Sequence, residues 1–146
     1  HATTYILPCS TPDSYEPDNS AASPTAIALG VHLQSHNFCQ PGDQDWVQFS
    51  AQAGVHYRVY ALPIAPSTAA AIEIYAADGT TLLSGGAAHS FGGLASAGWT
   101  ATSNQPYLIK VSHIDSAVAG DAVSYLLWID EGFELTLPSV MQVPPP

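Results

Sequence analysis

The most chemically distinctive stretch of the chain carries two carboxylates two positions apart, Asp43 and Asp45. It reads Gly42-Asp43-Gln44-Asp45-Trp46-Val47-Gln48-Phe49, beginning as an acidic turn and continuing as an alternating strand. Residues two apart in an extended backbone point to the same side, so both carboxylates are expected to face one way. At about 4 Å and an effective dielectric of roughly 20, their repulsion is about 4 kcal/mol. The stretch therefore predicts a cation-binding corner attached to a sheet.

A second acidic segment lies closer to the N-terminus, at Asp13-Ser14-Tyr15-Glu16-Pro17-Asp18-Asn19-Ser20. Half of its residues are Asp, Glu or Asn, which supply hard oxygen ligands. Calcium accepts irregular shells of oxygen ligands, whereas magnesium demands near-octahedral geometry, so a flexible acidic loop favours Ca²⁺. An ordinary solvated turn is the alternative interpretation.

The charge balance excludes one large class of partner. The 146 residues contain 2 Lys and Arg against 12 Asp and Glu, a formal net charge of -10. Such a chain has no basic surface to neutralise phosphates, so nucleic acid is not an expected partner. Only 10% of residues are charged, well below the usual quarter. A weakly charged surface suits packing against neighbouring subunits, although a secreted protein with a neutral surface would look the same.

Terminal and cysteine signals point to an extracellular protein. The chain starts at His1, without a signal peptide or an apolar stretch that would predict a membrane span. A mature exported chain fits this, and so does a chain cut at an arbitrary point. Cys9 and Cys39 are the two cysteines, and an even number in such a chain predicts a disulfide. A loop of that length would stabilise the fold by about 3–4 kcal/mol; two buried thiols are the alternative.

Strand signals recur at short spacing through the rest of the chain, and no segment keeps a 3.6-residue period. Asp78-Gly79 predicts a tight hairpin turn, residues 84–93 predict a loop, and residues 21–33 are ambiguous. Trp46 and Trp99 are interpreted as packing residues. The fold class is all-β, a jelly-roll-like antiparallel β-sandwich with extended N- and C-terminal arms. The expected strands are 47–51, 56–62, 70–76, 80–83, 98–102, 107–112, 123–129 and 133–137.

Several of these segments together resemble the bacterial pre-peptidase C-terminal (PPC) domain. The resemblance covers residues 13–130, in order and in spacing. The matching pieces are Tyr15-Glu16-Pro17-Asp18-Asn19-Ser20, Gly42-Asp43-Gln44-Asp45-Trp46-Val47-Gln48-Phe49, Ala53-Gly54-Val55-His56-Tyr57, Ile74-Tyr75-Ala76-Ala77-Asp78-Gly79-Thr80-Thr81-Leu82-Leu83, Tyr107-Leu108-Ile109-Lys110-Val111, His113, Gly120 and Tyr125.

The resemblance implies a calcium-binding β-sandwich of the kind appended to secreted proteases and other exported enzymes. One departure bears on the ligands: the family usually reads Glu-Pro-Asn-Asp, whereas this chain has Asp18-Asn19 as its last pair. Which of those two side chains binds the ion is therefore open. The implied ligands are Glu16, Asp18, Asn19, Asp43 and Asp45, with Asp13 as a weaker candidate.

Three regions follow from this interpretation. Residues 1–12 form an extended N-terminal arm, residues 13–137 the PPC-like calcium-binding sandwich, and residues 138–146 a proline-rich extended tail. The tail is apolar as well as proline-rich, which suits docking on another surface. Its candidate assembly residues are Leu137, Pro138, Val140, Met141 and Val143.

No catalytic constellation emerges, so the protein is not expected to be an enzyme. No Gly-x-Ser-x-Gly, His-Glu-x-x-His or Cys-x-x-Cys pattern is present. Copper chelation by His1 would need a second histidine, His56, His89 or His113, and the acidic motifs do not belong to such enzymes. His113 matches a position of the resembled family and is interpreted as structural.

Two non-enzymatic functions remain. The favoured one is self-assembly into an extracellular fibre, tube or coat, through edges and an apolar tail that dock on the next copy. The alternative is a binding module for polysaccharide or insoluble protein, derived from a secreted hydrolase. That second function predicts an exposed aromatic row on one sheet.

Overall fold

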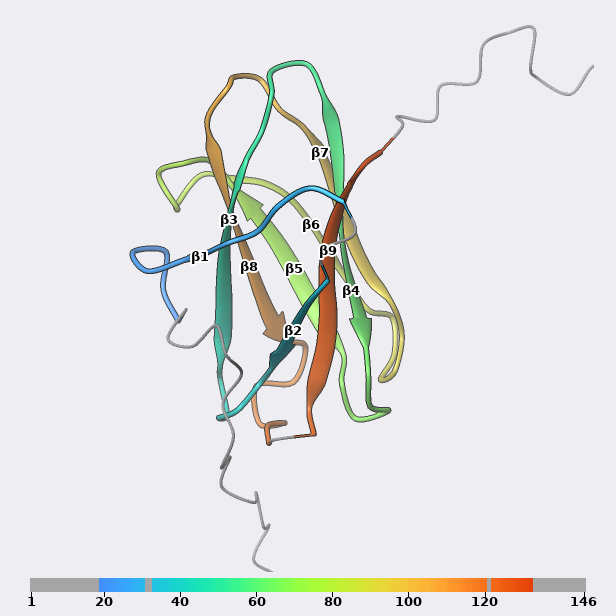
Figure 1. Cartoon of the computed structure of the whole chain (residues 1–146). Helices are drawn as coiled ribbons and strands as arrows, with labels where there is room; N and C mark the ends of the chain where they lie inside the picture. The colour runs from blue at the N-terminus through green and yellow to red at the C-terminus, as the bar shows by residue number, and fades with distance from the viewer. Residues whose placement is uncertain (1–18, 31–32, 121, 133–146) are drawn as a thin grey trace, which may run out of the picture.

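Short alternating segments separated by turn residues build two stacked sheets (Figure 1). The computed structural model describes residues 19–30, 33–120 and 122–132. One sheet has the strand order β1-β3-β8-β5-β6 and the other the order β2-β9-β4-β7. The predicted all-β sandwich is confirmed. The strands are β1 (Thr25–Ala26), β2 (Gln34–Asn37), β3 (Gln44–Ser50), β4 (His56–Pro63), β5 (Ala70–Tyr75), β6 (Leu82–Ala87), β7 (Ala95–Thr100), β8 (Pro106–His113) and β9 (Ser124–Glu131).

The core lies between the two sheets and is made by every second residue of the long strands. Alternation places Val47 and Phe49 of β3 inside with Val59 of β4, all at most 3% exposed. Trp46 and Trp99 are 7% and 5% exposed, which confirms their interpretation as packing residues. The remaining large, fully buried side chains are His36, Phe38, Ile72, Ile74, Tyr107, Ile109, Val111, Tyr125, Leu127 and Ile129.

Two local expectations change in the structure, and one strand was not expected at all. Residues 84–87 belong to β6 and are not part of a loop, because their small side chains let β6 approach β7 of the other sheet. The ambiguous region contains the short strand β1, which pairs with β3 in parallel, so the sheet is not wholly antiparallel. The polar segment 34–37 is the strand β2, paired with β9. The expected strand 133–137 lies outside the described residues.

The hairpin between β5 and β6 forms where Asp78-Gly79 predicted it. Gly79 has a φ of +73°, a left-handed conformation that favours glycine. Oδ1 of Asp78 accepts hydrogen bonds from the backbone N–H groups of Thr80 and Thr81, both at 2.8 Å. The hydrogen bond from the Thr81 hydroxyl, together with these two backbone bonds, lowers the pKa of the Asp78 carboxyl from 3.8 to about 2. The aspartate therefore holds the turn in its charged form.

Acid is expected to weaken this turn at an unusually low pH. Because the folded-state pKa lies below the unfolded value, Asp78 stabilises the fold fully above pH 3.8 and loses that effect as the pH falls through about 2. NMR titration of the Asp78 carboxyl should give a midpoint near 2, and the Asp78→Asn variant should lack that step. A midpoint near 3.8 would show that the turn does not prefer the carboxylate.

Candidate metal centre

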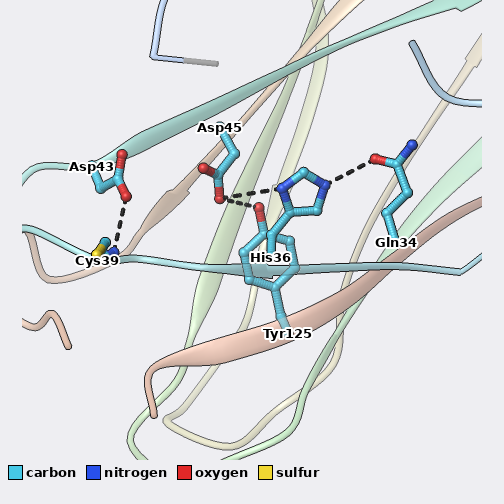
Figure 2. Close-up of polar contacts among 6 residues, drawn as sticks. All are labelled: Gln34, His36, Cys39, Asp43, Asp45 and Tyr125. Atoms are coloured by element: carbon cyan, nitrogen blue, oxygen red, sulfur yellow. Dashed lines mark hydrogen bonds and ion pairs between the residues drawn. The ribbon is translucent and has the colours of Figure 1, made fainter. Parts of the chain in front are cut away.

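Asp43 lies at the entrance to β3, held by a tight turn. Gly42, with a φ of +76°, donates its N–H to the carbonyl of Ser116 at 2.7 Å. Oδ2 of Asp43 then accepts the backbone N–H of Cys39 at 2.9 Å. The side chain is half-buried. The turn thus fixes one carboxylate beside the chain that follows β2 (Figure 2).

Asp45, two residues on, lies inside the sandwich with 0% of its surface exposed. Tyr125 of β9 donates its hydroxyl hydrogen to Oδ2 of Asp45 at 2.5 Å. Nδ1 of His36 in β2 lies 4.0 Å from the same oxygen. Figure 2 shows both aspartates of the pair pointing toward the segment that carries His36 and Cys39. The expectation that the two carboxylates face the same side is confirmed.

A directional chain of hydrogen bonds orients the imidazole of His36. Nε2 of Gln34 donates to the carbonyl of Ala26 at 2.9 Å, which leaves its Oε1 facing Nε2 of His36, also at 2.9 Å. An amide oxygen only accepts, so Nε2 of His36 carries a hydrogen. Nδ1 is then the nitrogen directed at Asp45. Protonation of Nδ1 would place a positive charge beside the buried carboxylate.

Aromatic stacking holds this polar cluster in place. The ring of His36 lies parallel to that of Tyr125, with centroids 5.5 Å apart and an interplanar angle of 13°. Tyr125 stacks in turn on Phe38, with centroids at 4.9 Å. We use "polar cluster" for Gln34, His36, Asp45 and Tyr125. It joins β2, β3 and β9, and thereby both sheets.

Only some of the predicted ligands lie among the residues that the structure describes. Asp43 and Asp45 come together, and Asn19 is exposed at the first described position. Within the described ranges, no group of three or more His, Cys, Asp or Glu side chains is arranged to hold a metal. Cys39 is not a free thiol, but its predicted partner lies outside the described residues, so the pairing stays a prediction. The predicted residues outside the description are Cys9, Asp13, Glu16, Asp18, Leu137, Pro138, Val140, Met141 and Val143.

The donors that are described fit a hard cation in type. Asp43 and Asp45 offer carboxylate oxygens, and calcium prefers oxygen ligands of this kind. Asp45 is fully buried, and a buried carboxylate is costly unless a positive charge or hydrogen bonds compensate it.

Sequence reasoning missed two members of the polar cluster, Gln34 and His36. Their segment, Gln34-Ser35-His36-Asn37, has no apolar residue and resembles a loop. The available signal was spacing: Gln34 and His36 lie two apart, as Asp43 and Asp45 do, so each pair shares one face of a strand. His113, by contrast, is buried as expected, and its Nε2 lies 2.9 Å from the carbonyl oxygen of Ser67.

Comparisons with known proteins identify the fold. No family model matches the chain, and no curated protein matches it. Among solved structures, it is similar to the crystal structure of the pre-peptidase C-terminal domain of collagenase from Bacillus anthracis, with a TM-score of 0.55 and 16% sequence identity. The match covers 72% of this chain and 92% of that one. The chain therefore has the PPC fold that its motifs resemble. None of the described residues forms a helix able to cross a membrane.

Proposed function

We propose that this protein is a non-catalytic, secreted β-sandwich that calcium stabilises and that assembles with copies of itself into an extracellular fibre, tube or coat. The observation that carries the proposal is the exposure of large apolar side chains. Nine of them are between 40% and 55% exposed on the described residues: Leu29, Leu33, Leu62, Ile64, Leu82, Leu83, Phe91, Leu94 and Ile114. Apolar side chains exposed in this way are available for contact between subunits, most of all where they lie side by side on one sheet.

Calcium would act at the entrance to β3. Asp43 and Asp45 would hold the ion together with Asp13, Glu16, Asp18 and Asn19, linking the N-terminal segment to the sandwich. The support is the pair of carboxylates directed at one segment (Figure 2) and the burial of Asp45. A bound divalent cation would offset the charge of that buried carboxylate. The predicted Cys9–Cys39 disulfide would join the same two parts of the chain.

The alternative is an accessory module that binds polysaccharide or an insoluble protein. It draws support from the similar domain, which belongs to a collagenase. It also draws support from a half-exposed aromatic pair on one sheet, Tyr60 and Trp128, whose stacked rings have centroids 5.1 Å apart. Electron microscopy of the full chain separates the two functions. Regular filaments or tubes support assembly, whereas dispersed particles that bind glycan or collagen support the accessory module.

Removing residues 138–146 is expected to abolish the polymer while leaving the fold intact. The deletion takes away Val140, Met141 and Val143 but no described strand. Negative-stain electron microscopy reports the polymer, and circular dichroism with a thermal melt reports the fold. Intact filaments from the truncated chain would contradict a role for the tail. If the filaments of the full chain were also lost in chelator, assembly would be linked to calcium.

A further inference from the structure

The outer face of the sheet β2-β9-β4-β7 carries a row of leucines at one end. Leu62 of β4 pairs with Leu126 of β9. On the other side, Ala61 pairs with Ala95 of β7, which places Leu94 beside Leu62. Leu62 and Leu94 are 42% and 49% exposed. Alternation puts all three side chains on the solvent side, because Ala61, Ala95 and Leu127 point into the core.

A second apolar row lies next to the first. Tyr60 pairs with Trp128, and their rings stack at an interplanar angle of 18°. Gln34 pairs with Leu127, so Leu33, 52% exposed, lies beside Trp128. We use "apolar face" for Leu33, Tyr60, Leu62, Leu94, Leu126 and Trp128. The next rows are polar: Arg58 pairs with Asp130, and Nδ1 of His56 lies 2.9 Å from the Thr100 hydroxyl.

The other sheet shows how this fold covers such a surface. Trp46 and Leu108 also point outward from their strands, yet they are only 7% and 6% exposed. Residues 19–26 cross that side of the sandwich (Figure 1), and a Cβ added at Gly79 would meet Ala21 at 3.0 Å and Leu108 at 3.3 Å. A segment with a turn at residues 20–23 thus lies close to one apolar sheet surface, while no described residue shields the apolar face.

The chain contains one further segment with the composition for this role, residues 133–146. Its sequence is Phe133-Glu134-Leu135-Thr136-Leu137-Pro138-Ser139-Val140-Met141-Gln142-Val143-Pro144-Pro145-Pro146, with one charged residue. Proline donates no backbone hydrogen bond, which disfavours addition to a sheet edge and favours packing of side chains on a surface. The eleven residues 133–143, fully extended, reach about 36 Å. An eight-residue strand is about 27 Å long, so this part of the segment is long enough to cross the sheet along a strand.

The direction of β9 decides which copy supplies this segment. β9 starts at the apolar end of the sheet and runs toward the polar rows (Figure 1). Gly132 still donates its N–H to the carbonyl of His56 at 2.9 Å, so the chain leaves the sheet heading away from its own apolar face. We infer that the apolar face of one copy binds residues 133–146 of the next copy. This inference rests on the proposed assembly, and such a head-to-tail contact gives an open polymer unless the rotation closes.

Cross-linking from the tail tests this contact in the full chain. Met141 is the only methionine in the sequence, so photo-methionine introduces one photoreactive group, within the tail. An equal mixture of ¹⁴N- and ¹⁵N-labelled chains is irradiated under assembling conditions, and the cross-linked peptides are mapped by mass spectrometry. Mixed-isotope cross-links to the apolar face are expected. Cross-links within one chain, cross-links to other surfaces, or an absence of cross-links would overturn the inference.

A pair of matched variants sharpens the result. Leu62→Glu places a charge at the centre of the apolar face and should lower the yield of mixed-isotope cross-links about tenfold or more. Leu82→Glu makes the same change at a leucine that is 55% exposed on the other sheet, and the yield should stay within about twofold. Equal yields from the two variants would overturn the inference.

Different results contradict the assembly and the docking of residues 133–146 on the apolar face. Filaments whose cross-links map to another surface would leave the assembly standing and exclude the apolar face. A full chain that stays dispersed in electron microscopy would contradict the assembly itself.

Discussion

Asp45→Ala is expected to lower the free energy of unfolding by about 3–5 kcal/mol, because it removes the partner of buried groups. Tyr125 would lose the acceptor of its 2.5 Å hydrogen bond, and Nδ1 of His36 would lose the carboxylate it faces. Asp45 is 0% exposed, so little water is available to replace it. Urea denaturation at neutral pH measures the loss.

Asp45→Asn separates the hydrogen bond from the charge. An amide oxygen still accepts the Tyr125 hydroxyl, so this variant should retain more stability than Asp45→Ala. If calcium binds here, the wild-type melting temperature falls in chelator, whereas that of Asp45→Asn responds much less. A wild-type melting temperature that is the same in excess calcium and in chelator would refute calcium stabilisation. Equal stability of the two variants would show that the hydrogen bond contributes nothing.

Gly86→Ala is expected to destabilise the fold by about 3 kcal/mol or more, since the added methyl group has no space. A Cβ on Gly86 would lie 2.0 Å from the carbonyl oxygen of Ser96 and 3.0 Å from its carbonyl carbon. Both atoms are backbone atoms of β7, so the two sheets would have to separate there. Differential scanning calorimetry measures the change, and loss of a cooperative transition is the extreme form of the same result.

Gly98→Ala is the matched control for that substitution. Gly98 also lies in a strand, but its added Cβ would meet the ends of the Arg58 and His56 side chains at 3.1 Å. Those ends move easily, so the change should stay within about 1 kcal/mol. If the two variants melted alike, the close approach of β6 and β7 would not limit stability.

The sequence predicted those parts of the fold that local pattern determines. The turn at Asp78-Gly79 follows from one glycine and one carboxylate, and the strands expected at 107–112 and 123–129 are β8 and β9. β2 could not be predicted in this way, because its polar side chains are buried against distant partners. Gln34 bonds to Ala26, while His36 faces Asp45 and stacks on Tyr125. Those partners are distant in the sequence, so no local signal reveals the strand.

The candidate site was predicted to a similar extent. The two-residue spacing of Asp43 and Asp45 correctly placed their carboxylates on one side. The spacing did not reveal that Asp45 is fully buried whereas Asp43 is half-buried. That difference arises because β9, which carries Tyr125, packs over the inner face of β3. The loop predicted for residues 84–87 was wrong, because small residues resemble a loop until the neighbouring sheet is known.

The close approach of Gly86 to Ser96 also makes the two sides of the sandwich unequal in how they can move. On that side the sheets touch through backbone atoms, and β6 contacts β7 across the layers. On the opposite side they are joined through the side chains of the polar cluster. Side chains change rotamer far more readily than a backbone shifts. A breathing motion of this molecule would therefore pivot about β6 and β7 and open between β2 and β3, exposing Asp45 to solvent before any core residue near the pivot.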